Sequence, residues 1–389
     1  MRFPEFSGEW DSFKLVELGK FIGGGTPSSS NLSFWTGSIP WISSSDIKED
    51  NINNISISRY ITEDAIEKSA TKYCPAPVIL IVSRVGVGKV ALSHTSLCTS
   101  QDFCNIIEIK CHPVFLSYNL LRTMKRKSRE VQGTSIKGIT SDELQKIRVF
   151  IPKNKDEQNK ISNLLTLLDE RIATQNKIIE DLKKLKSAII EKTFNENYSN
   201  KIRLRDVGSY IRGLTYSSDD VVESNGIFVM RSNNIINGSS LDYHNNIVSV
   251  NKQILTEQQL QTGDIVICMA NGSSSLVGKS SFYDGDCSTP ITVGAFCGIY
   301  RSKEPIVKWL FQTNKYRRYI WNSLQGGNGA IANLNGDDIL RMSFSIPATP
   351  AKDNRIKLLT SVDTLLESNI SLCDLYISQK LYLLRQMFI

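Results

Sequence analysis

The chain carries one pattern of motifs twice, which constrains its fold more than any other feature. Its 389 residues divide into two halves whose motifs follow the same order. Residues 24–29 (GGTPSS) correspond to 213–218 (GLTYSS), 39–47 (IPWISSSDI) to 227–235 (IFVMRSNNI), 85–92 (VGVGKVAL) to 275–282 (SLVGKSSF), and 136–152 (IKGITSDELQKIRVFIP) to 331–347 (IANLNGDDILRMSFSIP). Solenoid repeats are only about 20–50 residues long, so this pattern predicts two copies of one domain.

The duplication argues against a cofactor loop at the glycine-rich residues 23–25. An S-adenosylmethionine loop needs intact glycines, whereas the second copy has Gly213 followed by Leu214. A Walker A loop requires G-x-x-x-x-G-K-[ST], and Gly272 lies one residue too far upstream of the GKS at 278–280. The three histidines, His94, His112 and His244, form no recognisable triad, and no paired-carboxylate motif is evident. We therefore expect no catalytic residues, no cofactor and no metal in this chain.

Composition fits a globular protein with a polyanionic partner. Hydrophobic residues make up 41% and the formal net charge is +7, a mild basic excess that suits nucleic acid. No apolar run approaches the roughly 20 residues of a membrane span, and the N-terminus lacks a signal-peptide core. We expect a cytoplasmic protein whose eight cysteines are reduced. Cys98, Cys104 and Cys111 are spaced too widely for a usual zinc site, and we expect buried thiols.

Each copy ends in a long helical pattern. Apolar residues recur at steps of three and four, at Ile161, Leu164, Leu168, Ile178, Leu182, Leu185 and Ile189, and again at Ile356, Leu359, Val362, Leu366, Ile370, Cys373, Ile377, Leu381 and Leu384. Neither Gly nor Pro interrupts the first stretch, so about 40 residues would form a rod of about 60 Å. We expect the two helices to pair as an antiparallel coiled coil. The alternative is that each helix packs on its own domain.

The remainder of each copy predicts mixed α and β structure. Residues 76–82 and 263–270 are typical of buried strands, and 105–110 and 147–152 alternate as half-buried strands do. Thr140 and Glu143 form a capping box, whose spacing Asn335 and Asp338 keep. Residues 114–131 predict a helix with a basic end, and 305–324 its counterpart. Trp41 and Trp309 are expected in the core. The predicted fold is α+β: domains at 1–152 and 201–348, with long helices at 153–200 and 349–389.

These motifs together resemble the DNA-specificity subunits of Type I restriction–modification systems. The resemblance is carried by RFPEFSGEW, GGTPS…FWTGSIPWISSSDI, GITSDELQKIRVFIP…DEQNKI and the closing LLRQMF, and it spans essentially the whole chain. It implies two target-recognition domains that each read half of a bipartite double-stranded DNA site. It also implies that the helices set the spacer and dock two methyltransferase subunits, and that a nuclease–translocase subunit joins the complex. S-adenosylmethionine, ATP and Mg²⁺ are then expected on the partner subunits only.

Candidate DNA contacts follow from the side chains that reach phosphates and base edges. They are Ser43, Ser44, Ser45, Arg84 and Lys89 in the first copy, and Arg231, Asn233, Asn234, Asn271 and Lys279 in the second. Two basic clusters could bind phosphate: Lys125, Arg126 and Lys127 with Arg129, and Lys315 with Arg317 and Arg318. Solvated helix surface is the alternative for each cluster. The second copy lacks the Thr-Pro pair and an arginine equivalent to Arg84, so the two domains should read different sequences.

Two rival functions remain open at the level of sequence. One is a small DNA methyltransferase or nuclease, against which the missing catalytic spacing argues. The other is a coiled-coil scaffold that binds only protein.

Overall fold

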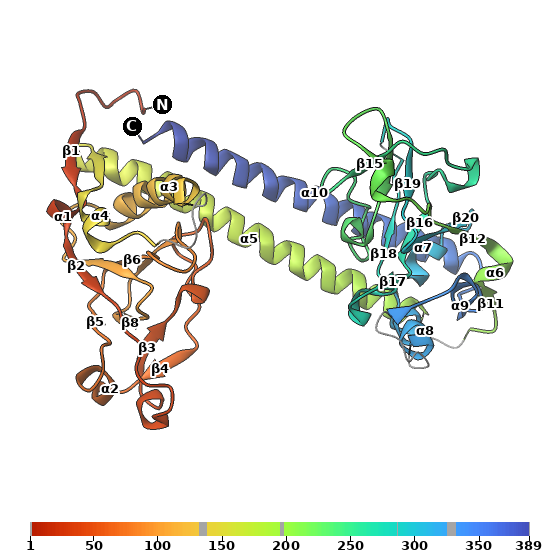
Figure 1. Cartoon of the computed structure of the whole chain (residues 1–389), viewed down its shortest axis with the longest axis horizontal. Coiled ribbons are helices and arrows are strands. Elements are labelled where there is room, and N and C mark those ends of the chain that lie inside the picture. Colours follow the sequence, from red (N-terminus) through yellow and green to blue (C-terminus); the bar gives the residue numbers. More distant parts are fainter. Residues whose placement is uncertain (1, 132–137, 195–197, 286, 325–331, 389) are drawn as a thin grey trace. The chain divides into compact units, whose positions relative to one another are not determined.

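The computed structural model describes residues 2–131, 138–194, 198–285, 287–324 and 332–388 (Figure 1). Contacts divide the chain into two units, and the division falls within the two long helices rather than at their ends. Unit 1 comprises Met1–Lys177 and Ile370–Ile389, and unit 2 comprises Ile178–Asn369. Both long helices therefore contribute to both units.

The described residues of unit 1 form three small sheets. Its strands are β1 (Asp11–Lys14), β2 (Lys20–Gly23), β3 (Ile39–Ile42), β4 (Arg59–Ile61), β5 (Tyr73–Cys74), β6 (Val78–Ile81), β7 (Val90–Ser93), β8 (Leu97–Thr99), β9 (Cys104–Ile107) and β10 (Arg148–Ile151). Its shorter helices are α1 (Leu15–Leu18), α2 (Glu63–Glu67), α3 (Pro113–Val131) and α4 (Ser141–Lys146). The sheet orders are β2-β9-β6-β7, β4-β3-β8-β5 and β1-β10, and β3 pairs with β8 in parallel.

Unit 2 repeats this arrangement. Its strands are β11 (Lys201–Arg203), β12 (Gly208–Arg212), β13 (Val221–Val222), β14 (Ile227–Met230), β15 (Val248–Val250), β16 (Ile265–Cys268), β17 (Ala270–Asn271), β18 (Ser280–Phe282), β19 (Ile291–Val293), β20 (Cys297–Ser302), β21 (Ala332–Asn333) and β22 (Ser343–Ser345). Its shorter helices are α6 (Leu204–Val207), α7 (Val307–Leu310), α8 (Asn314–Leu324) and α9 (Gly336–Leu340).

The strand order of unit 2 confirms the duplication. Its sheets run β12-β20-β16-β18, β13-β15-β14-β19 and β11-β22, and the strands β17 and β21 add a fourth, two-stranded sheet. The parallel pair β14–β19 corresponds to β3–β8, and β11–β22 to β1–β10. The predicted buried strands are β6 and β16, and the alternation predicted at 147–152 appears in β10, where burial alternates residue by residue.

The long helices α5 (Lys155–Phe194) and α10 (Ala351–Gln386) pair antiparallel, as predicted. In unit 1 Asp169 of α5 pairs with Lys380 of α10, and Asn176 with Cys373. In unit 2 Lys186 pairs with Asp363. The helices also pack on the domains: Phe388, just beyond α10, contacts the rings of Trp10 and Phe115 in unit 1.

The apolar seam between the helices was predicted wrongly in part. Ile178 and Leu185 are 40% and 49% exposed, and Ile370 and Ile377 are also exposed. The neighbouring Ile179 is buried instead. Lys186 and Lys380 are buried in the seam as well. A pattern search for apolar residues passes over lysines, although a buried lysine is stable when a carboxylate faces it.

One helix was also predicted wrongly. Residues 305–324 form α7 and α8 rather than a single helix, because Thr313 interrupts them. Its buried hydroxyl donates to the Leu310 carbonyl at 2.7 Å and accepts from the Tyr316 N–H at 3.1 Å, so it caps α8. The two capping boxes at Thr140 and Asn335 are present as predicted.

The cysteines and tryptophans lie where the sequence indicated. All eight cysteines are free thiols; six are buried, and Cys111 and Cys287 are half-buried. Burial raises the pKa of Cys74 to about 11 and that of Cys98 to about 12. Trp41 and Trp309 are core residues. Within the described residues, no helix is long and apolar enough to cross a membrane.

Candidate nucleic-acid interface

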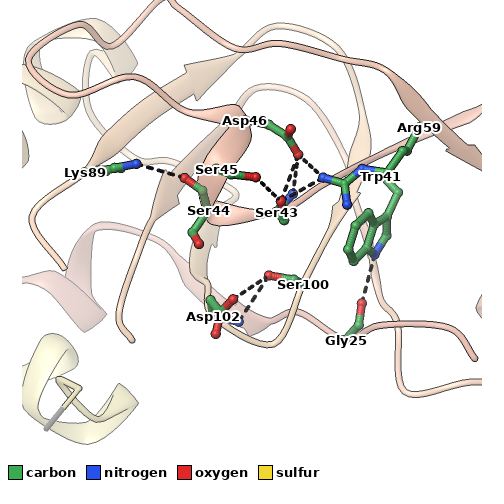
Figure 2. Close-up of polar contacts among 10 residues, drawn as sticks. All are labelled: Gly25, Trp41, Ser43, Ser44, Ser45, Asp46, Arg59, Lys89, Ser100 and Asp102. Carbon is green, nitrogen blue, oxygen red and sulfur yellow. Dashed lines mark hydrogen bonds and ion pairs between the residues drawn. The ribbon is translucent and has the colours of Figure 1, made fainter. Parts of the chain in front are cut away.

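In unit 1 the serine-rich turn after β3 is held by a carboxylate. Asp46 accepts hydrogen bonds from the Ser43 N–H at 2.7 Å and the Ser43 hydroxyl at 3.1 Å (Figure 2). Arg59 on β4 forms an ion pair with Asp46 and donates to the Ser43 hydroxyl at 2.7 Å. Its guanidinium lies 4.6 Å from the centre of the Trp41 ring, whose indole N–H donates to the Gly25 carbonyl at 3.0 Å. The turn is therefore fixed before any ligand binds.

The other predicted residues of unit 1 surround this turn. The Ser45 side chain is exposed, with its hydroxyl 2.8 Å from that of Ser43. Lys89 donates to the Ser44 carbonyl at 3.1 Å, which ties the β6–β7 loop to the turn (Figure 2). Arg84 lies exposed in the same loop as Lys89. Ser45 and Arg84 are thus accessible to a ligand, whereas Ser43 and Lys89 also support the loops.

The equivalent turn of unit 2 follows β14 and uses an amide in place of the carboxylate. Asn234 accepts from the Arg231 N–H at 2.9 Å, and its amide nitrogen donates to the carbonyls of Asp242 and Asn245 at 3.0 and 2.7 Å. Asn234 is fully buried, so it supports the turn and is not part of the interface proposed below. Arg231 and Asn233 are exposed.

A pocket of about 530 Å³ joins two predicted residues of unit 2. It is lined by Leu214, Tyr216, Ser217, Ser218, Arg231, Ser232, Ala270, Asn271, Gly272, Gly294, Ala295, Phe296 and Cys297. The Asn271 amide donates to the Ser232 hydroxyl at 3.2 Å and its oxygen accepts from the Ser273 N–H at 3.0 Å. Arg231 donates to the Asn246 carbonyl at 3.2 Å. The pocket combines a cation, an amide and aromatic rings on a fixed backbone.

Lys279 lies apart from that pocket. It lines a cavity of about 420 Å³ with Arg317 and Trp321. Trp321 is 63% exposed, which is unusual for so large a ring. The structure thus brings Lys279 to the basic surface of α8 rather than to Arg231 and Asn271.

The basic residues of α3 form a groove with the end of α10. The groove has a volume of about 270 Å³, and its cations are Arg122, Lys125, Arg126 and Arg129 from α3 and Arg385 from α10. Lys125 pairs with Asp50 at 2.7 Å. Burial, and then the charge of Arg126, lower the pKa of Arg122. Lys127 is half-buried on the same helix. Such a concentration of positive charge favours an anion.

The second basic cluster lies on α8. Arg317 and Arg318 are exposed, and Lys315 is half-buried with its ammonium 5.7 Å from the centre of the Phe344 ring. Burial, followed by the charges of Lys201 and Arg318, lowers the pKa of Lys315.

Sequence reasoning missed several residues of these surfaces. Arg59 is 16 positions from Ser43, and no local motif links them. Arg385 joins the groove only through the packing of α10. Phe296 lies just after a buried strand, and a phenylalanine there is ordinarily expected in the core. Its side chain is nevertheless 67% exposed.

Comparison with protein families finds a match in the first part of the chain. The model of the Type I restriction modification DNA specificity domain matches residues 7–184. Residues 7–184 are therefore similar in sequence to this DNA specificity domain. The resemblance inferred from the sequence motifs is thereby confirmed.

Curated specificity subunits align with less than half of the chain. The chain is 32% identical over 195 residues to the Type I restriction enzyme MjaIX specificity subunit of Methanocaldococcus jannaschii, covering 48% of this chain and 44% of that one. It is 34% identical over 177 residues to the EcoR124I/EcoR124II specificity subunit of Escherichia coli, covering 43% of each. The matched part is therefore less than half the length of these relatives.

Solved structures extend the likeness in fold to the whole chain. The Type I S subunit from M. genitalium superposes with a TM-score of 0.60 at 15% identity, covering 100% of this chain and 99% of that one. A structure described as showing complex assembly and conformational transition of the Type I R-M system gives a TM-score of 0.53 at 14% identity, with 98% and 96% coverage. Both support the fold of the specificity domain and its repeat.

Proposed function

We propose that the chain is the DNA-specificity subunit of a Type I restriction–modification complex and that each unit reads one half of a bipartite double-stranded target. The observation that carries this proposal is one scaffold built twice with different exposed side chains at equivalent positions. In the turn after the first strand of the parallel pair, unit 1 exposes Ser45 where unit 2 exposes Asn233; unit 1 also exposes Arg84 in its β6–β7 loop, and unit 2 exposes Arg231 in the turn itself. Serine, arginine and asparagine are side chains that read base edges.

The charge distribution supports DNA as the partner. The groove of α3 and α10 and the cluster on α8 supply cations for phosphates, which fix the position of a protein on DNA without reading sequence. The turns after β3 and β14 supply the sequence-reading groups. Each unit therefore needs a basic surface that contacts phosphates and a turn that contacts base edges.

Methyltransferase subunits are proposed to dock on α5 and α10. These helices expose large apolar side chains, Leu167, Leu185, Leu358, Leu365, Leu375 and Tyr382, at 45–64%. Such exposed side chains would supply apolar contacts to a subunit that covers these helices. Because the scaffold occurs twice, two methyltransferase subunits fit best, and a nuclease–translocase subunit then completes the complex.

The chain itself is proposed to be non-catalytic and cytoplasmic. S-adenosylmethionine, ATP and Mg²⁺ then belong to the partner subunits. Incubating the purified chain with labelled S-adenosylmethionine and DNA should transfer no label. Reproducible transfer by the chain alone would instead favour a small methyltransferase.

A domain exchange tests the proposal most directly. The chain is assembled with a methyltransferase subunit of a Type I system, and residues 201–347 are replaced by the corresponding part of a related subunit. Mapping of methylated adenines should show one half of the target changed and the other kept. The matched control exchanges 1–152 and should change the opposite half. Alteration of both halves by either exchange would contradict independent readers, and absence of any DNA binding would favour a protein scaffold.

A further inference from the structure

In each unit the second strand of the parallel pair, β8 or β19, is followed by a turn of the same kind. In unit 1 the turn follows β8, where the Ser100 N–H donates to the Ile42 carbonyl at 2.9 Å. In unit 2 it follows β19, where the Gly294 N–H donates to the Met230 carbonyl at 2.8 Å. Ile42 is the last residue of β3 and Met230 the last residue of β14. Each of these turns therefore lies beside the turn that follows β3 or β14, which we call the reading turn of its unit. Figure 2 shows Ser100 and Asp102 next to the serine-rich turn.

Both turns are fixed by backbone contacts. The carbonyl of Asp102 accepts from the Ser83 N–H at 2.8 Å, and the carbonyl of Phe296 accepts from the N–H groups of Met269 and Ala270 at 2.8 and 3.1 Å. In each unit the backbone of a glycine packs closely against this turn. A Cβ at Gly24 would collide with the Ser100 carbonyl, and one at Gly213 with the Gly294 carbonyl. The repeated glycines thus allow a loop to pack against the turn.

The side chains on this shared backbone differ completely. Asp102 in unit 1 and Phe296 in unit 2 occupy equivalent places, preceded by Gln101 and Ala295. Gln101 accepts from the Thr26 hydroxyl at 2.5 Å, and Asp102 from the Ser100 hydroxyl at 3.2 Å. Phe296 is 67% exposed although its backbone is held rigidly. An exposed phenyl ring on a fixed turn costs free energy that contact with an apolar group would recover.

The surroundings of Phe296 indicate the kind of group it meets. It lines the 530 Å³ pocket together with Arg231, Asn271 and Tyr216. Arginine pairs with guanine and asparagine with adenine in the major groove, and the apolar group displayed in that groove is the 5-methyl of thymine. The minor groove offers no methyl group. A phenyl ring beside a guanidinium and a carboxamide therefore matches the major-groove edge of a purine next to a thymine.

We infer that Phe296 determines specificity by packing against the 5-methyl group of a thymine in the half-site read by unit 2, and this inference rests on the proposed function. Asp102 holds the equivalent position in unit 1, where a carboxylate accepts from an exocyclic amine such as cytosine N4. The same turn thus gives the two units different preferences without any change of backbone.

The test uses the full chain assembled with its methyltransferase partner and a duplex library randomised in both half-sites. Wild-type complex should select a thymine in the unit 2 half-site. Replacing that thymine by uracil, which lacks only the methyl group, should weaken binding about fourfold, the contribution of one buried methyl group. The Phe296→Ala complex should bind the thymine and uracil duplexes equally. Phe296→Leu should retain the preference in part.

Asp102→Ala provides the matched control because it alters the equivalent turn of unit 1. It should change selection only in the unit 1 half-site and leave the thymine preference intact. A Phe296→Ala complex that still prefers thymine over uracil, or a wild-type half-site without a required thymine, would overturn the inference while the proposed function stands. A wild-type complex without sequence preference would overturn both.

Discussion

The ammonium of Lys186 lies 2.5 Å from Oδ1 of Asp363, and both side chains are only 7% exposed. Lys186 also donates to the Gly238 carbonyl at 2.9 Å, in the loop that follows the reading turn of unit 2. Unit 1 repeats the arrangement: Lys380 pairs with Asp169 and donates to the Asp50 carbonyl at 2.5 Å. In each unit a buried lysine therefore joins both long helices to a loop of the reading domain.

The two pairs differ in what remains when the lysine is removed. Lys380→Met leaves Asp169 with the Tyr118 hydroxyl, which donates at 2.7 Å. Lys186→Met leaves Asp363 with Lys308 at 2.7 Å. A buried charge without its ionic partner costs about 3–5 kcal/mol. We expect Lys380→Met to lower the free energy of unfolding by about that amount and Lys186→Met by distinctly less, as measured by urea unfolding.

Lys160→Met is the matched control for this comparison. Its partner is Glu5, and both side chains are about half exposed, at 48% and 46%. Exposed pairs contribute about 0–1 kcal/mol. Equal losses for all three variants would show that the buried pairs do not secure the loops.

Buried tyrosines should make the protein sensitive to alkali. Burial, and then the charge of Asp169, raise the pKa of Tyr118 above its ordinary value of 10.0, and burial alone raises that of Tyr300. Above pH 10 the unfolded chain loses these protons while the folded chain keeps them. The contribution to stability is complete below pH 10 and declines as the pH rises further.

Absorbance at the phenolate band measures this directly. The Tyr118 and Tyr300 phenolates should appear only together with loss of the helical circular dichroism signal, whereas exposed tyrosines titrate earlier. Tyr118→Phe and Tyr300→Phe should each remove one late-titrating group. Smooth titration of all tyrosines near pH 10, with the fold intact, would contradict the expectation.

Asn234 and its neighbour Asn233 separate structural support from DNA contact. Asn234 is fully buried and its amide nitrogen bonds two carbonyls, so Asn234→Ala leaves these carbonyls unsatisfied. We expect a loss of about 1–3 kcal/mol in stability. Asn233 is exposed, and Asn233→Ala should leave the melting temperature unchanged. A change in DNA selection by Asn233→Ala at unchanged stability would assign it to the interface.

The groove of α3 and α10 should contribute to the salt dependence of DNA binding. Each phosphate contact adds about 0.9 to the slope of log affinity against log salt. Arg126→Ala with Arg129→Ala should reduce this slope by about one to two while the methylated sequence stays the same. Lys183→Ala with Lys184→Ala on the exposed face of α5 removes equal charge as a control. Equal slopes for the two double variants would assign Arg126 and Arg129 to solvated surface.

The sequence predicted the duplication and the main strands and helices, but it did not predict contacts between residues that are far apart in the chain. The duplication is visible because the same motifs recur in the same order in both halves of the chain. The strands β6 and β16 and the two long helices follow from local hydrophobic patterns. The pairing of Arg59 with Asp46 depends on strand register, and the burial of Lys186 and Lys380 depends on a carboxylate from another helix. Asn234 was selected as a base reader because its residue type suits that role, but type alone cannot reveal burial.

The final prediction concerns the helices as the determinant of the spacer between half-sites. Each helix runs from one unit into the other, and in unit 1 Cys373 lies 3.7 Å from the Asn176 side chain across the pair. Inserting one heptad after Asn176 and one after Leu372 keeps the seam in register. It adds about 10 Å of helix at 1.5 Å per residue, close to three base pairs at 3.4 Å each.

We expect the unspecified spacer to lengthen by about two to four base pairs while both half-sites keep their bases, as read by mapping methylated adenines. The insertion also rotates one unit relative to the DNA axis, so a series with one and two heptads samples more than one orientation. A heptad in α5 alone is the control; it puts Lys186 out of register with Asp363 and should destabilise the protein. An active double insertion whose target keeps its original spacer would refute the role of the helices in setting that distance.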